Sequence, residues 1–315
     1  MKYRRLGNAG MKVSAVALGG WTTFGDSLKD EKLARDIIVK AYDRGINFFD
    51  ITDAYAKGES ETMMGQTVRA FPRHTLVISS KLFWPMSDDV NDRGLSRKHI
   101  MESIDKSLKR IGTDYLDIYF CHRYDEETPL EETVRAMDDL IHQGKILYWG
   151  TSEWTADQIQ EALMICEKGG YYRPQTEQPQ YSMLQRDTVE GEILPVTEPN
   201  GMGLVVFSPL ATGLLTGKYD DGIEDDSRFA RLDFLRERWH QQNYLNAVRE
   251  LKPIADDLGV TRAQMAIGWT LRNSGVSSAI TGATRVDQLD ETIKSVDINF
   301  DDESLDRIDA ILGTL

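Results

Sequence analysis

The sequence has few cysteines and no long hydrophobic run, and both absences narrow the kinds of protein it can be. Its 315 residues include only Cys121 and Cys166, too few for a disulfide framework. No stretch approaches the roughly 18 uninterrupted apolar residues of a membrane-spanning helix. The amino-terminal segment MKYRRLGNAGMKVSAVALGG lacks the apolar core of a secretory signal. We therefore expect a cytoplasmic protein without membrane insertion.

Positive charge is also scarce. Lysine and arginine number 37 against 51 aspartates and glutamates, which gives a formal net charge of −14. Such a surface repels nucleic acid and anionic membranes, so neither is expected as a partner. Hydrophobic residues make up 41% of the chain and charged residues 28%, which is typical of a globular protein with a large core. We interpret residues 1–315 as a single domain.

Two ligand-binding patterns are missing as well. The first apolar run is followed by GGWTTFG, which does not have the G-x-G-x-x-G spacing of a dinucleotide-binding turn. The missing spacing argues against a doubly wound open sheet, which is the second-ranked fold prediction. The chain has no cysteine cluster and no His-x-x-x-His pattern, so no metal site is expected.

What the sequence does contain is a regular alternation of short apolar runs and amphipathic helical patterns. Strands buried on both faces are expected at Val13–Leu18, Ile46–Phe49, Leu76–Ser79, Tyr115–Cys121, Ile146–Trp149, Gln175–Glu177, Leu204–Phe207 and Ser278–Ile280. Helices are expected at Glu31–Arg44, Glu59–Ala70, Arg97–Arg110, Leu130–Gln143, Ala156–Lys168, Arg186–Glu198, Leu245–Leu258, Arg262–Arg272, Val286–Ser295 and Ser304–Leu312. The pattern predicts an α/β fold, a (β/α)₈ TIM barrel. It adds extra carboxyl-terminal helices and a long catalytic-side loop or insertion, Leu214–Gln242.

Four polar residues lie at or just beyond the ends of three of these runs. Asp50 and Tyr55 occur in FFDITDAY, Lys81 in LVISSK and His122 in YLDIYFCH. In a parallel barrel the strand ends form one rim, where catalytic residues gather. Tyr55 can donate a proton, Lys81 can favour its phenolate, and Asp50 can hold Lys81 charged. His122 can orient a substrate oxygen, so the set suits protonation of an oxyanion during carbonyl reduction.

Each of the four residues also has an ordinary explanation when it is taken alone. The Asp-x-x-x-x-Tyr spacing is common by chance, a lysine after a strand is often a surface residue, and a lone histidine is usually structural. It is their shared position at strand termini that favours a functional interpretation.

No side chain supplies a hydride, so a reductase of this kind needs a cofactor. The second half of the chain offers a distributed anion and nucleotide site in the segments GTSEW, EQPQY, FSPLATGLLTGK and ITGATRVDQLDETI. Small residues at a helix start expose backbone N–H groups to phosphate, and lysine or arginine adds charge. The alternative for each segment is a tight turn with solvated cations.

These residues carry a resemblance to a known family. The chain resembles the aldo-keto reductases, and within them the branch that contains the β subunits of voltage-gated potassium channels. The resemblance extends nearly end to end and rests on the order of the segments RGINFFDITDAYAKGESE, ISSKLFW, RGLSRKHI, SLKRIGTDYLDIYFCHR, TPLEETVRAMDDLIHQGKILYWGTSEW, EQPQYSML, FSPLATGLLTGKY and GVSSAITGATRVDQLDE. It implies a (β/α)₈ barrel that binds NADP(H), the catalytic tetrad Asp50, Tyr55, Lys81 and His122, and a small carbonyl substrate. A homo-oligomer, by resemblance a tetramer, is also implied.

The resemblance further implies which residues hold the cofactor. Ser152 and Gln178 would hold the carboxamide, Trp21 and Thr22 would lie near the nicotinamide, and Tyr181 is a candidate for stacking on it. Ser208, Leu210, Gly213 and Lys218 would face the pyrophosphate. Arg228, Thr284 and Gln288 would meet the adenosine 2′-phosphate, and Glu291 would touch the adenine. The remaining implied contacts are Asp50, Phe207, Pro209, Ala211, Gly282 and Arg285.

The sequence departs from the channel subunits at several informative positions. They typically carry asparagine where this chain has His122, the usual reductase residue, which favours a competent enzyme. Ala56 replaces a common glycine, and Glu153 replaces an arginine.

Two other functions stay open. One is an NADP-binding, redox-sensing regulatory subunit with little turnover. The other is a barrel hydrolase with paired carboxylates such as Glu153 and Glu177. The expected substrate pocket is partly aromatic, with Phe24, Phe83, Trp84, Tyr124, Tyr181 and Trp239 as candidates.

Overall fold

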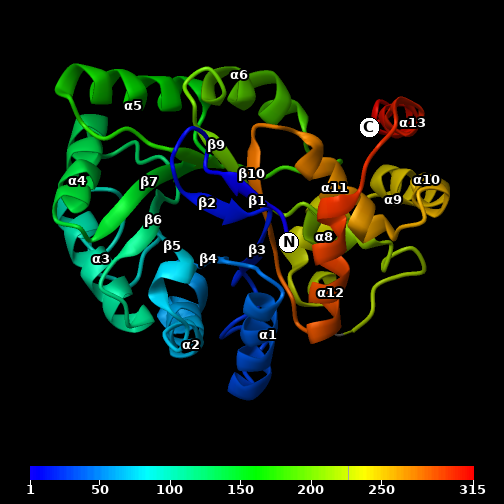
Figure 1. Ribbon diagram of the computed structural model, residues 1–315, viewed down its shortest axis with the longest axis horizontal. Coiled ribbons are helices and arrows are strands. Elements are labelled where there is room, and N and C mark those ends of the chain that lie inside the picture. Colours follow the sequence, from blue (N-terminus) through cyan, green and yellow to red (C-terminus); the bar gives the residue numbers. More distant parts are fainter. Residues whose placement is uncertain (226) are drawn as a thin grey trace.

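Eight parallel strands close into a barrel in the computed structural model, which describes residues 1–225 and 227–315 (Figure 1). Around the ring the strands follow the order β10-β3-β4-β5-β6-β7-β8-β9. Their bounds are β3 Val16–Gly19, β4 Phe48–Asp50, β5 Val77–Leu82, β6 Leu116–Cys121, β7 Ile146–Ser152, β8 Thr176–Gln178, β9 Gly203–Phe207 and β10 Val276–Thr281. The closed ring confirms the predicted (β/α)₈ barrel and excludes the open sheet, because β10 pairs with β3.

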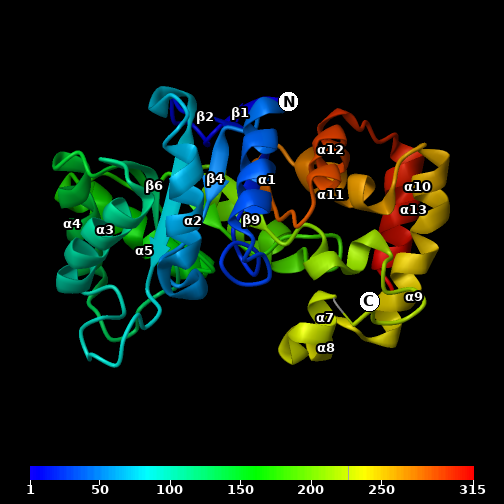
Figure 2. The same cartoon turned by 90° about the horizontal axis from the view of Figure 1, so that it is seen from below.

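Helices surround the barrel in the views of Figures 1 and 2. Side-chain caps fix several of their starts; Asp30 accepts the N–H groups of Lys32 and Leu33, and Ser96 accepts that of His99. The helices of the ring are α1 Glu31–Asp43, α2 Glu59–Val68, α3 Arg97–Ile111, α4 Leu130–His142, α5 Ala156–Gly169, α6 Leu194–Thr197, α11 Arg262–Arg272 and α12 Val286–Lys294. None of the helices in the described part of the chain has the length and apolar composition needed to cross a bilayer.

The amino-terminal strand prediction was wrong in detail. The run Val13–Leu18 is divided between β2 (Lys12–Ser14) and β3, and β2 pairs antiparallel with an additional strand, β1 (Tyr3–Arg5). The residues of β1 are largely exposed and carry two arginines, so no apolar run marks them. In Figure 2 this hairpin lies at the end of the barrel opposite α7 (Arg228–Arg231) and α8 (Asp233–Trp239). It therefore covers the end away from those helices.

Two further helical predictions also differ from the structure. Leu245–Leu258 is interrupted at Leu251, giving α9 (Gln242–Glu250) and α10 (Lys252–Asp257), since Pro253 cannot donate a hydrogen bond within a continuous helix. Arg186–Glu198 contains a π-helical turn, Val189–Ile193, before α6. The long loop Leu214–Gln242 contains α7 and α8, and the chain ends with α13 (Asp302–Leu312).

The hydrophobic residues form two separate cores. The larger core lies between the barrel and its helices, whereas a smaller one includes Leu6 and Val13 of the hairpin segment and residues such as Ala17, Phe48 and Phe120 of the strands. Successive strand residues point to opposite faces, so the smaller core marks the inward-facing positions of each strand. The same alternation determines which polar residues face the barrel interior at the carboxyl ends of the strands.

Candidate active site

Strand parity brings five polar side chains together at the carboxyl ends of the barrel strands. Asp50 is two residues beyond the inward-facing Phe48, and His122 is two beyond Phe120. Lys81, Ser152 and Gln178 occupy the equivalent positions of β5, β7 and β8; Lys81 lies four residues after the inward-facing Val77, and Ser152 pairs in register with Gln178. Their side chains therefore converge from neighbouring strands rather than merely follow apolar runs.

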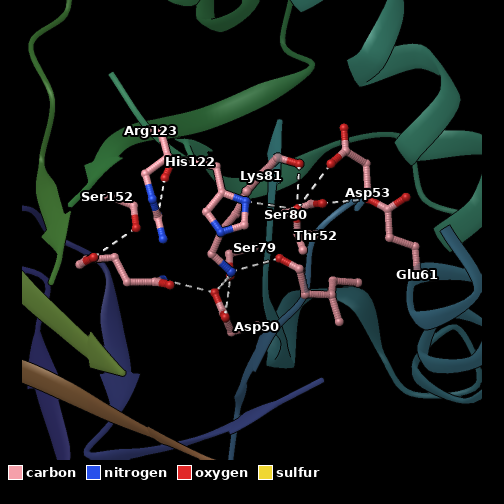
Figure 3. A network of polar contacts seen from close by, with 12 residues as sticks. Asp50, Thr52, Asp53, Glu61, Ser79, Ser80, Lys81, His122, Arg123 and Ser152 are labelled. Atoms are coloured by element: carbon pink, nitrogen blue, oxygen red, sulfur yellow. Dashed lines mark hydrogen bonds and ion pairs between the residues drawn. The ribbon is translucent and has the colours of Figure 1, made fainter. Parts of the chain in front are cut away.

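A buried ion pair anchors this cluster. The ammonium of Lys81 donates to Asp50 Oδ2 at 2.7 Å and to the carbonyl of Ile51 at 2.9 Å. The other carboxylate oxygen of Asp50 accepts from Ser79 at 2.7 Å and from the amide of Gln178 at 3.1 Å (Figure 3). Burial lowers the pKa of Lys81 below its ordinary value, and the neighbouring Asp50 opposes that effect. Lys81 is fully buried, so it acts from beneath the cavity surface.

Tyr55 is positioned by a strained turn that follows β4. It begins a 3₁₀ turn in which Ala56 and Lys57 have φ angles of 48° and 52°, in the left-handed region that favours glycine. Position 56 would therefore suit the glycine that is common in the family, but the turn forms with Ala56 as well. The ring centroid of Tyr55 lies 5.5 Å from Lys81 Nζ and 6.1 Å from the ring centroid of His122.

The electrostatic surroundings of Tyr55 favour its protonated form. Burial, reinforced by Asp50, raises the pKa of Tyr55 above its ordinary value, and Arg123 is the cation that opposes the rise. Lys81 is paired with Asp50 at 2.7 Å, and its expected role in favouring the phenolate of Tyr55 stays a prediction. At neutral pH Tyr55 is therefore a phenol that still holds its proton.

His122 is held in a neutral state. Its Nδ1 lies 3.4 Å from the hydroxyl of Thr52, and its ring meets those of Tyr55 and Trp84 edge to face. Burial, together with the charges of Lys81 and Arg123, holds the pKa of His122 well below its ordinary value. A neutral imidazole can hydrogen-bond a substrate oxygen without competing with Tyr55 as the acid.

One cavity of about 980 Å³ connects this cluster with the loops after β9 and β10. Tyr55 and His122 line it, as do nearly all of the residues expected to bind a cofactor. These are Trp21, Asp50, Ser152, Gln178, Phe207, Ser208, Pro209, Leu210, Gly213, Lys218, Arg228, Gly282, Thr284, Arg285, Gln288 and Glu291. Thr22 and Ala211 do not line the cavity; each has a positive φ angle in a turn beside it.

The chemistry of this lining fits a phosphorylated dinucleotide. Lys218, Arg228, Arg231, Arg262 and Arg285 line the cavity, and arginine and lysine are the usual partners of phosphate. Arg228 and Arg231 make no ion pair with the described residues, whereas Arg262 is paired with Asp220 at 2.6 Å. The hydroxyl of Ser152 and the amide of Gln178 are available for a carboxamide, since the side-chain oxygen of Gln178 accepts no bond from the residues described.

Several lining residues were missed from the sequence. Arg123 directly follows His122, a signal that could have been used. Arg231 lies three residues after Arg228 on α7, so the two share one face of that helix. Arg262 enters from the start of α11, which carries no local sign of a binding site.

The cavity is partly aromatic, as predicted, but most of the named aromatic candidates do not line it. Of the six aromatic candidates for the substrate pocket, Trp84 alone lines the cavity. Tyr181 is fully buried against Trp269, its hydroxyl donates to Glu190 at 2.6 Å, and it does not line the cavity. Phe24 and Trp239 are core residues.

The paired-carboxylate hydrolase finds no support in the geometry. Glu177 points away from the cavity, is fully buried, and accepts bonds from Thr151 and the backbone N–H of Trp154. Glu153 accepts the N–H of Gln180 at 2.6 Å and does not line the cavity. The two carboxylates therefore do not flank a cleft.

Comparisons with known proteins agree with the fold. The model of the "Aldo/keto reductase family" matches residues 15–313. The chain is 49% identical to a "Probable voltage-gated potassium channel subunit beta" of Arabidopsis thaliana, over 95% of this chain and 92% of that protein. It is 46% identical to a protein of the same description from Oryza sativa subsp. japonica, over 99% and 97% of the two chains. A "Putative voltage-gated potassium channel subunit beta" of Schizosaccharomyces pombe is 42% identical over 99% and 93%. The chain belongs to the aldo/keto reductase family.

Proposed function

We propose that this protein is an NADPH-dependent oxidoreductase that reduces an aldehyde or a ketone to an alcohol. The observation that carries the proposal is the cavity itself, which joins Tyr55 and His122 to a group of cations. A proton donor at one end and phosphate partners at the other are the two requirements of such a reductase.

The chain's own residues account for the proton and for the orientation of the substrate. Tyr55 donates its phenolic proton to the carbonyl oxygen, and neutral His122 hydrogen-bonds the same oxygen. Ser152 and Gln178 would hold the carboxamide of a bound nicotinamide. A bound NADPH supplies the hydride, so one carbonyl and one proton give one alcohol and NADP⁺.

Lys81 and Asp50 act by stabilising the charge that Tyr55 develops. Losing the proton turns Tyr55 into an anion in a buried site, which is costly unless a cation is near. The ammonium of Lys81 is 5.5 Å from the ring centroid, and Asp50 keeps that ammonium in place. In this role Lys81 stabilises the product state of proton transfer rather than the resting phenol.

The first experiment is the replacement Tyr55→Phe. It removes the donor hydroxyl and keeps the ring, so we expect NADPH-dependent reduction to fall roughly 100-fold or more. The affinity for NADPH should stay nearly unchanged, because the phosphate partners are untouched. The measurement is NADPH oxidation at 340 nm with a panel of aldehydes, ketones and quinones, beside a titration of NADPH binding. Turnover close to that of the parent would remove Tyr55 from the donor role.

A second candidate is a cofactor-binding subunit of a potassium channel with little turnover, which the descriptions of the three relatives favour. It predicts tight NADPH binding and negligible reduction of every carbonyl in the same assay. A homotetramer and a cytoplasmic location fit either function and form part of this proposal.

A further inference from the structure

Arg123 occupies a position that the proposed mechanism does not use. It directly follows His122 beyond the end of β6, and its side chain lines the cavity. Figure 3 shows its guanidinium pointing into the space between Ser152 and His122. The guanidinium therefore faces the cavity that Tyr55 and His122 also line.

The side chain is held in this orientation from two sides. Its Nη1 donates to the carbonyl of His122 at 2.5 Å, and its guanidinium carbon lies 5.7 Å from the ring centroid of Trp84. Trp84 also meets the ring of His122 edge to face, so the tryptophan and the arginine flank the imidazole. The guanidinium is thus oriented before any ligand arrives.

The charge of Arg123 has no partner in the part of the chain that the structure describes. No carboxylate of residues 1–225 or 227–315 lies within 4.0 Å of its guanidinium, whereas the neighbouring Lys81 is paired with Asp50. One N–H is used by the backbone, which leaves the rest of its five donors free. A half-buried, oriented and unpaired guanidinium is a ready partner for an anion.

The cofactor does not supply that anion under the proposed function. The phosphate partners Lys218, Arg228 and Arg285 come from the loops after β9 and β10. In the ring order, β6 stands opposite β10, so Arg123 approaches the cavity from the side away from these cations. Arg123 instead contacts the backbone carbonyl of His122 and the ring of Trp84, which line the cavity together with Tyr55.

We infer that the substrate is an anionic carbonyl compound, an aldehyde or ketone that carries a carboxylate, and that Arg123 binds this carboxylate while Tyr55 and His122 contact the carbonyl oxygen. The inference rests on the proposed reductase function and names its substrate class. Because Arg123 and His122 are adjacent in the chain, the carboxylate and the carbonyl of the substrate are close to each other in a small molecule.

The test compares two substrates that differ only in charge. The protein with NADPH reduces 4-carboxybenzaldehyde and its neutral methyl ester, methyl 4-formylbenzoate, and kcat/KM is measured for each. The parent should prefer the acid. Arg123→Met should lower kcat/KM for the acid roughly 10- to 100-fold more than for the ester, because only the acid loses a charge-assisted hydrogen bond. The loss of positive charge beside Tyr55 acts on both substrates alike. Arg123→Lys, which keeps the charge, should recover part of the loss.

Two outcomes would overturn the inference. One is a parent enzyme that shows no preference for the acid. The other is an equal loss for acid and ester in Arg123→Met, which would mean that Arg123 only holds the backbone of His122.

A binding measurement separates this inference from the proposed function. If neither aldehyde is reduced, the reductase proposal fails, and calorimetry with benzoate and the neutral benzamide decides about Arg123. Benzoate should bind at least tenfold more tightly than benzamide, with NADP⁺ present and in its absence, and Arg123→Met should abolish the difference. Equal affinities for the two ligands in the parent would refute an anion site at Arg123.

Discussion

At the scale of single residues, the cavity is bordered by strained backbone. Among the residues that the structure describes, the non-glycine residues with positive φ are Thr22, Ala56, Lys57, Glu153, Ser208, Ala211 and Thr212. All of them follow the carboxyl ends of barrel strands, whereas no such residue lies at the hairpin end. Left-handed conformations cost about 1–2 kcal/mol for residues with a side chain, so the strain is concentrated where the proposed ligands bind.

The site residues could be predicted from the sequence to the extent that they follow apolar runs. Asp50, Lys81 and His122 were found because a buried strand ends in front of them, and parity then makes them converge. The pKa of Tyr55 and the orientation of Arg123 could not be predicted, since both depend on packing between segments distant in the sequence.

The choice of cofactor gives a prediction at this scale. Arg228 lines the cavity without an ion-pair partner among the described residues, and under the proposed function it contacts the extra phosphate of NADPH. Replacing it with methionine should weaken NADPH binding roughly 10- to 100-fold, because a charge-assisted hydrogen bond is lost, and should leave NADH binding nearly unchanged. Both dissociation constants can be measured by fluorescence titration. Equal effects on the two cofactors would place Arg228 elsewhere on the dinucleotide.

At the scale of elements, the helices around the barrel pack through close contacts that cannot be predicted from the sequence. The helices α2 and α3 pack where Gly65 meets the end of α3. A Cβ on Gly65 would lie 2.4 Å from the carbonyl oxygen of Ile111 and 2.6 Å from its Cα, so a larger residue cannot fit without a shift of backbone. Periodicity predicted both helices well, but it contains no information on which residue must be small at their contact.

This contact yields a stability prediction with a built-in control. Gly65→Ala should lower the free energy of unfolding by about 1–3 kcal/mol, because it overpacks the contact between α2 and α3. Gly191→Ala makes the same chemical change in the π-helical turn, where no heavy atom from outside that turn lies within 4 Å of the added methyl group. It should be neutral or stabilise by about 0.5–1 kcal/mol. Urea unfolding of the parent and the two variants measures these free energies. A Gly65→Ala protein as stable as its parent would contradict a tight contact between α2 and α3.

The elements that sequence reasoning missed are those whose stability comes from other elements. The strand β1 has a charged, exposed sequence and is fixed by pairing with β2. The break between α9 and α10 is subtle because the N–H of Leu251 still bonds to Ala247. Local periodicity describes a segment by itself, so it cannot reveal a strand that exists only through its partner.

At the scale of the whole molecule, burial of carboxyl groups opposes their ionisation. The chain carries a net charge of −14, yet several of its carboxyl groups are enclosed in the protein. Burial and the neighbouring Glu61 raise the pKa of Asp53 to about 7, and burial raises the pKa of Glu177 to about 8. Both groups bind protons more tightly in the folded protein than in the unfolded chain.

Stability should therefore fall as the pH rises through this range. Between the unfolded pKa values near 4 and the folded values of about 7 and 8, the unfolded chain has lost protons that the folded protein retains. Each group should then reduce the free energy of unfolding by about 1.4 kcal/mol per pH unit. Urea unfolding between pH 5 and pH 8 measures this slope. Asp53→Asn and Glu177→Gln should each flatten it, and a stability that increases toward pH 8 would show that other groups dominate.

The closed barrel also determines when the protein can begin to work. The residues that line the cavity extend from Gly19 in the first barrel strand to Thr292 in α12, so no short segment of the chain contains the whole cavity. During synthesis the early strands emerge long before β10 can pair with β3. A nascent chain thus has no complete binding site until nearly all of it has left the ribosome. A ligand of the cavity can therefore bind and stabilise only the closed barrel. It cannot assist the folding of the strands that emerge earlier.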